Sequence, residues 1–274
     1  MSIKTLIAGG DSYTEVKQDL EGRFMDMWPA HIGAEEYINV GYGGAGNSFI
    51  FNRVIDAIEE NIEKELTVIV LWSDSARINL LDCVNVQLQS ERQLLKVPHW
   101  FSKPSLQMCE VISEFSNLVV ELMWKQQKKK DTAQGFYEKM MTQSLRYMYL
   151  LDKYCGMHGI KFYHGCVFDV LGYNTLDSLE RYFDVSDNVS IRNAALKNIK
   201  KSHYYNYLLD SKNFMGFDFD VSSYIKNNNL TISEINTHAS QYGNKVLANL
   251  INEFIATGNK PKTDNIELSP YIYD

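Results

Sequence analysis

The sequence contains no apolar run that approaches the roughly 20 residues of a membrane-spanning helix. Its first ten residues, MSIKTLIAGG, lack the long apolar core and the cleavage site of a signal peptide. We therefore expect a soluble protein that is made in the cytoplasm and has no membrane span.

Basic residues are fewer than acidic ones: the chain has 27 Lys and Arg and 34 Asp and Glu, for a net charge of -7. Nucleic acids attract fields of Lys and Arg, so we expect no nucleic-acid partner. The lysine-rich stretch KQQKKKD at 125–131 is interpreted as a solvated connection, because a short run of lysines in a polar turn rarely makes a binding patch.

Cysteines are few, and none has CxxC or Cys/His spacing; they are Cys83, Cys109, Cys155 and Cys166. This argues against a zinc site or a disulfide framework and predicts free, buried thiols. Asp218 and Asp220 lack the further clustered ligands that a cation would need. We therefore expect no metal and no cofactor.

What is present is a βαβ pattern with enough hydrophobic residues, 45% of the chain, for a sizeable core. Continuous apolar runs at 4–10, 37–44 and 66–72 predict strands that are covered on both faces. Between the second and third runs, an apolar stripe over 47–66 predicts a helix. Asn47 or Ser48 is its expected N-cap, and Glu60 and Lys64 its expected solvent-side ion pair.

A strand, a helix and a strand at this spacing call for a parallel sheet with right-handed crossovers, and so for an α/β fold. A further helix is predicted at 136–154, with Gly156 as its stop signal, and it leads to a fourth strand at 160–168. A last helix is predicted to end at Gly258. Two segments interrupt the alternation, at about 79–135 and 168–230. We interpret both as insertions, with helices and loops, among them a helix at 105–124, in a single domain that covers residues 1–274.

The loops that follow the first three strands should meet at one edge of such a sheet, where ligands bind. They contain Ser12, the glycines at 41–46, and residues 72–77. Ser12 could be a nucleophile or merely a helix cap. His238, just ahead of the last helix, is the candidate base for it.

Four blocks together resemble the SGNH (GDSL-type) hydrolases, which are serine esterases and lipases on a flavodoxin-like parallel sheet in a three-layer α/β/α sandwich. The form W-S-x-x-x-R at 72–77, with GxGN at 44–47 before the first predicted helix, resembles a divergent branch associated with phage and with surface-glycan gene clusters. The blocks occur in the family's order and are GGDSYT with Ser12, NVGYGG with Gly44, VIVLWSDSAR with Asp74, and NTHASQYGNKVLA with His238.

The resemblance implies that Ser12 is the nucleophile, that His238 is its base, and that the backbone N–H groups of Ser12 and Gly44 bind the oxyanion. Two positions depart from the family pattern. Asn236 stands where the family usually has an Asp that orients the histidine, and Asp74 stands where it has an Asn that donates to the oxyanion. Asn47, Ser73 and Ser75 are candidates to replace that donor, and Arg77 is the expected partner of Asp74.

The implied activity is hydrolysis of a small O-acyl ester, for example an acetyl group on a carbohydrate, through an acyl-enzyme. The implied partner is thus a small acyl ester or an acylated glycan. An alternative is a catalytically inactive protein with this fold that binds carbohydrate or is part of a virion, in which case it would be virion-associated. An acyltransferase with the same nucleophile is a third interpretation. His164 is expected to be structural, and the tyrosines of the second insertion are candidates to stack on sugar rings.

Overall fold

A computed structural model of the chain describes residues 3–16, 24–75, 130–169, 171, 188–234 and 236–262. The predicted helix at 105–124, and nearly all of the first insertion, lie outside the described residues, as do Arg77, Cys83 and Cys109. Within the described ranges, no helix is long and apolar enough to cross a membrane.

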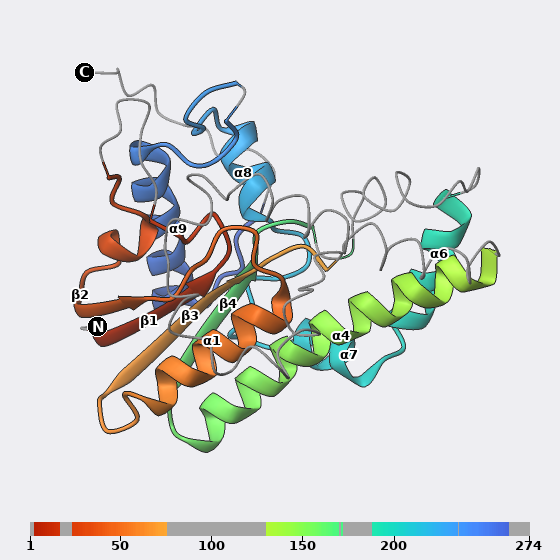
Figure 1. Cartoon of the computed structure of the whole chain (residues 1–274), viewed down its shortest axis with the longest axis horizontal. Coiled ribbons are helices and arrows are strands. Elements are labelled where there is room, and N and C mark those ends of the chain that lie inside the picture. The colour runs from red at the N-terminus through yellow and green to blue at the C-terminus, as the bar shows by residue number, and fades with distance from the viewer. Residues whose placement is uncertain are drawn as a thin grey trace, which may run out of the picture.

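Four parallel strands form the sheet, in the order β2-β1-β3-β4 (Figure 1). Their bounds are Ile3–Gly10 for β1, Ala34–Asn39 for β2, Leu66–Trp72 for β3 and Lys161–Cys166 for β4. The α/β class and the parallel sheet expected from the sequence are confirmed. Because β2 and β3 lie on opposite sides of β1, the strand order reverses between β1 and β3, where ligands bind in open α/β sheets.

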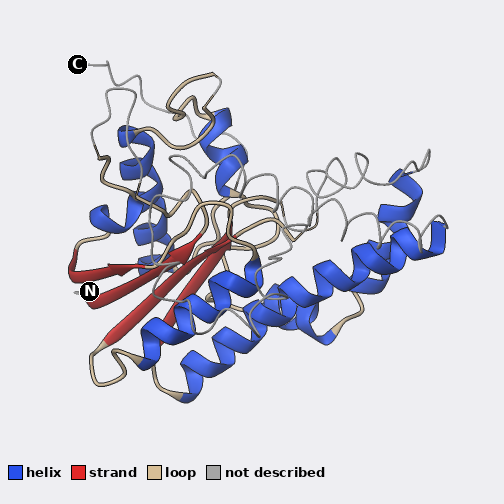
Figure 2. Cartoon of the chain, in the orientation of Figure 1, coloured by secondary structure: helices blue, strands red, loops and turns tan. Residues whose placement is uncertain are grey.

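Helices cover both faces of the sheet, which explains the continuous apolar runs of β1 and β3 (Figures 1 and 2). The expectation that the second strand is covered on both faces is wrong, because every residue of β2 is half-buried or exposed. In β1, Ile7 belongs to the core on one face, whereas Leu6 and Ala8 belong to the core on the other. The first face carries α1 (Asn47–Glu59) and α4 (Lys130–Met157), and α6 (Asn188–Ile199) and α7 (His203–Asp210) pack on α4. The second face carries the 3-10 helix η1 (Trp28–His31), α8 (Val221–Asn227) and α9 (Gln241–Thr257).

The predicted cap of α1 is wrong. Gly46 occupies the N-cap position and makes no side-chain cap bond. The Asn47 side chain instead bonds to the backbone of Ser73, with its Oδ1 accepting from Ser73 N at 2.8 Å and its Nδ2 donating to Ser73 O at 3.0 Å. A cap prediction uses local sequence only, and here a contact between two loops of the sheet edge takes the side chain.

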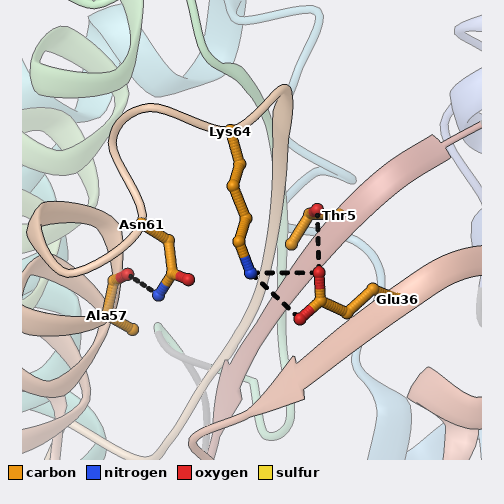
Figure 3. Close-up of polar contacts among 5 residues, drawn as sticks. All are labelled: Thr5, Glu36, Ala57, Asn61 and Lys64. Atoms are coloured by element: carbon orange, nitrogen blue, oxygen red, sulfur yellow. Dashed lines mark hydrogen bonds and ion pairs between the residues drawn. The ribbon is translucent and has the colours of Figure 1, made fainter.

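The predicted pair of Glu60 and Lys64 is also wrong, because α1 ends at Glu59 and the two residues are not on one helical face. Asn61 Nδ2 donates to Ala57 O at the helix end, and Lys64 turns to β2, where its Nζ lies 3.0 Å from both carboxylate oxygens of Glu36 (Figure 3). The ion pair of Lys64 with Glu36 thus links the turn before β3 to the edge strand β2.

The later helices agree with the sequence apart from their ends. Helix α4 begins earlier than predicted, within the supposed first insertion, and runs past Gly156 to Met157. Gly159, with φ of 67°, is the left-handed residue that follows it. The end of α9 at Gly258, with φ of 70°, is confirmed. In the second insertion, α6 and α7 pack on α4, and α8 packs beside α9.

Candidate active site

A tight turn carries Ser12 away from the end of β1. The carboxylate of Asp11, which is fully buried, accepts from Tyr13 N at 3.0 Å and from Ser73 Oγ at 2.9 Å. The Asp11 carbonyl accepts from Thr14 N at 2.9 Å. Asp11 therefore closes the turn and joins it to the loop after β3.

The loop after β2 lies against the same turn. Asn39 Nδ2 donates to Thr14 O at 2.7 Å, and Tyr42 N donates to Gly10 O at 3.1 Å. A Cβ atom on Gly41 would lie 2.7 Å from the Thr14 carbonyl carbon, so only glycine allows this approach. The loops after β1, β2 and β3 thus meet at one edge, as the sequence predicted.

His238 lies over Ser12 on a segment that precedes α9. Residues 230–232 hold this segment, since Ile232 N donates to His238 O at 2.9 Å and Ser240 N donates to Leu230 O at 2.8 Å. His238 Nε2 lies 2.9 Å from Ser12 Oγ, and His238 Nδ1 lies 2.8 Å from Asn236 Oδ1. Residues from the two ends of the chain form one hydrogen-bonded line.

The chemistry of the three groups fixes the direction of these bonds. Asn236 N donates to Ser233 Oγ at 2.9 Å, which helps to hold the residue in place. An amide oxygen can only accept, so the proton of the neutral imidazole is on His238 Nδ1. The bare Nε2 then accepts from the Ser12 hydroxyl. This is the tautomer that a base needs to activate a serine.

Ser12 does not act as a helix cap within the described residues, because 13–16 form turns and bends. Its backbone N–H and that of Gly44 have no acceptor among the residues that the structure describes. Gly44 has φ of 75°, the left-handed region in which glycine is favoured. Both N–H groups are therefore available to an incoming oxygen.

The three candidate side-chain donors differ. Asn47 Nδ2 donates to Ser73 O and to Ser144 Oγ, both at 3.0 Å, and so has no hydrogen left for an oxyanion. Ser73 donates its hydroxyl to Asp11 and its N–H to Asn47. Ser75 is different, because its buried Oγ has no hydrogen-bond partner in the described structure. Asp74 lies between Ser73 and Ser75 and is half-buried.

His164 lies in the core below this edge. Its ring is stacked between Phe162 and Phe214, and Trp72 Nε1 donates to its Nδ1 at 3.1 Å. Burial lowers the pKa of His164 to about 3, with a smaller effect from Lys260, so the ring is neutral. This packing agrees with the expectation of a structural histidine, but the ring is not fully satisfied, since its buried Nε2 has no hydrogen-bond partner among the described residues.

The other residues singled out in the sequence lie elsewhere. Asp220 caps α8 by accepting from Ser223 N at 2.7 Å. The described residues contain no group of three or more His, Cys, Asp or Glu that could hold a metal ion. Cys155 and Cys166 are free and buried. Of the tyrosines of the second insertion, Tyr173 and Tyr182 lie outside the described residues, and Tyr207 donates to Asp152 at 3.0 Å.

Sequence reasoning did not identify Tyr13 as part of the site. Its ring lies against that of His238, with centroids 4.9 Å apart and planes at 36°. Its hydroxyl reaches Thr237, which is 224 positions later in the chain. The only signal in the sequence was its place next to Ser12.

Comparison of the chain with models of known protein families, with curated proteins and with solved structures found no match. The interpretation of the site therefore rests on its geometry and chemistry.

Proposed function

We propose that the protein is a serine esterase of the SGNH type that hydrolyses a small O-acyl ester. The observation that carries the proposal is the line of two hydrogen bonds, 2.8 and 2.9 Å long, from Asn236 through His238 to Ser12. A serine bonded to a base, which is oriented by a third residue, is the arrangement of an activated nucleophile. The three-layer sandwich of the SGNH hydrolases belongs to this proposal.

In the first half of the reaction, Ser12 Oγ attacks the ester carbonyl carbon while His238 Nε2 takes the hydroxyl proton. The carbonyl oxygen becomes an oxyanion, for which the N–H groups of Ser12 and Gly44 are the proposed donors. His238 then gives its proton to the leaving alcohol oxygen as the ester C–O bond breaks. The acyl group remains on Ser12.

In the second half, a water molecule gives a proton to His238 and its oxygen attacks the acyl carbon. The bond to Ser12 Oγ breaks, and His238 returns the proton to that oxygen. Asn236 holds the imidazole in the required tautomer but supplies no negative charge to the imidazolium. We therefore propose a slower enzyme than one with a carboxylate at this position.

An acetyl group on a carbohydrate is the proposed example of a substrate, and the cytoplasm or a virion is the proposed setting. The resemblance of the sequence blocks supports the substrate and the virion setting, and the absence of a signal-peptide pattern at 1–10 supports the cytoplasm. The order β2-β1-β3-β4 supports the flavodoxin-like assignment, because it corresponds to part of the flavodoxin strand order.

The test is hydrolysis of p-nitrophenyl acetate and butyrate by the purified protein, beside Ser12→Ala and His238→Ala. Labelling by a fluorophosphonate is read by intact mass, because this probe reacts with activated serines. We expect turnover and one label on the wild type, and neither on the two variants. Absence of both from the wild type would refute the esterase proposal for these esters and favour the alternative of a non-catalytic, carbohydrate-binding or virion protein.

A further inference from the structure

Tyr13 joins the nucleophile turn to the segment that carries the base. Its side chain is only 3% exposed and packs edge to face on Phe168, with ring centroids 5.9 Å apart. The ring also packs against that of His238, as described above. A side chain that follows the nucleophile directly is thus part of the wall that holds the imidazole.

The hydroxyl of Tyr13 lies at a junction of three segments. It is 3.1 Å from Thr237 O and 3.1 Å from Ser222 Oγ. A carbonyl oxygen can only accept, so the phenol proton goes to Thr237, and the Ser222 hydroxyl donates to Tyr13 Oη. Ser222 is fixed in turn, since its N–H donates to Val167 O just beyond β4, at 2.8 Å.

The phenol keeps its proton throughout the pH range of such an enzyme. Burial raises the pKa of Tyr13 above its ordinary value; the hydrogen bonds with Ser222 and Thr237 lower it by less, and the negative charges of Asp11 and Asp220 raise it further. The donor to Thr237 is therefore permanent.

We propose that Tyr13 is a positioning residue, which sets the distance between Ser12 Oγ and His238 Nε2 by packing its ring against the imidazole and by donating to the carbonyl of Thr237. The peptide that Tyr13 binds lies between Asn236 and His238, the two residues that must keep their bond. A displacement of this peptide would move the base and its orienting group together. The role in catalysis rests on the proposed esterase function.

The test variant is Tyr13→Phe, which keeps the ring and removes the bond to Thr237. We expect kcat for p-nitrophenyl acetate to fall by about tenfold to a hundredfold, since small misplacements of reacting groups have effects of this size, while KM changes by less than about twofold. Ser222→Ala keeps the bond to Thr237 and should have a smaller effect. The matched control is Tyr224→Phe, in a tyrosine that is buried in the same core and 1% exposed.

A second readout does not depend on turnover. The six histidines are labelled with ¹⁵N, and the ring signals of His238 are assigned with His238→Ala. We expect Tyr13→Phe to shift the Nδ1 and Nε2 signals of His238 and Tyr224→Phe to leave them in place. A role limited to packing would instead lower the melting temperature of Tyr13→Phe and leave kcat and the imidazole signals unchanged, which would overturn the proposal.

The two proposals can fail separately. If the wild type neither turns over nor takes the label, the esterase function fails, and the histidine signals still decide whether Tyr13 positions the imidazole. If the wild type is active while Tyr13→Phe has wild-type kcat and wild-type signals, the positioning role fails and the esterase function stands.

Discussion

Replacing Asn236 by Asp tests the electrostatics of the site most directly. The two side chains have nearly the same shape, so the acceptor for His238 Nδ1, now at 2.8 Å, is preserved. Asn236 and His238 are both half-buried, so an added carboxylate can stay hydrated. The change therefore adds one negative charge beside the imidazole and little else.

The expected gain follows from Coulomb's law. Two unit charges about 4 Å apart attract by about 4 kcal/mol at an effective dielectric constant of about 20. Solvent screens a half-exposed pair, so we take roughly half of this, ~2 kcal/mol. The imidazolium forms on the way to the transition state, so kcat should rise about thirtyfold, at 1.36 kcal/mol for each factor of ten.

The assay is p-nitrophenyl acetate hydrolysis across a pH range. A carboxylate favours the protonated imidazole, so the acid limb of the pH–rate profile should also move to higher pH in Asn236→Asp than in the wild type. The matched control is Asn259→Asp, which adds the same charge at an exposed position beyond the other end of α9. An unchanged or lower kcat in a folded Asn236→Asp protein, measured on the plateau, would refute the reasoning.

Three further predictions concern residues around the site. Ser75→Ala removes a buried hydroxyl that has no partner among the described residues, so the free energy of unfolding in urea should rise by up to about 1 kcal/mol. A fall in kcat of about a hundredfold or more would instead identify Ser75 as an oxyanion donor. Gly41→Ala places a Cβ against the backbone of Thr14, so the free energy of unfolding in urea should fall by about 1–3 kcal/mol. Unchanged stability would show that the loop can move to accommodate the methyl group. The pKa of His164 is about 3 in the folded protein and near 6.5 in the unfolded chain, so between these pH values only the unfolded chain binds the extra proton. The free energy of unfolding should therefore fall as the pH decreases from about 6.5 to 3, by up to about 1.4 kcal/mol per pH unit. His164→Phe should flatten this slope, and an unaltered slope would assign it to other groups.

The sheet could be predicted from the sequence because its inner strands β1 and β3 are buried almost throughout. The run Leu66–Trp72 is fully buried, and the predicted bounds are those of β3. In β2 the prediction began three residues late, at Tyr37, since Glu35 and Glu36 are exposed and interrupt the apolar run. Edge strands have one less neighbour and therefore a weaker sequence pattern.

The pairing of Ser12 with His238 was expected from the resemblance of short blocks and from the rule that places ligands at the carboxyl ends of parallel strands. The hydrogen bonds of the Asn47 side chain with the Ser73 backbone could not be expected, since they depend on how close α1 lies to the end of β3. The contact between Tyr13 and Thr237 is likewise a product of tertiary packing. Local patterns identify which loops meet, and only the folded chain shows which side chains bond.

The two edges of the described sheet differ in how they meet other chains. Along β4, residues 213–220 run beside the strand and make parallel bridges at His164 and Cys166, so its outer backbone groups are partly occupied. The outer strand β2 instead exposes Glu35 and Glu36, each of which has a lysine of its own chain as a partner. A second copy that tried to extend the sheet there would bring its own carboxylates against these. Charged side chains on an edge strand disfavour such strand addition, so Glu35 and Glu36, which pair with lysines of the same chain, also disfavour aggregation of the protein.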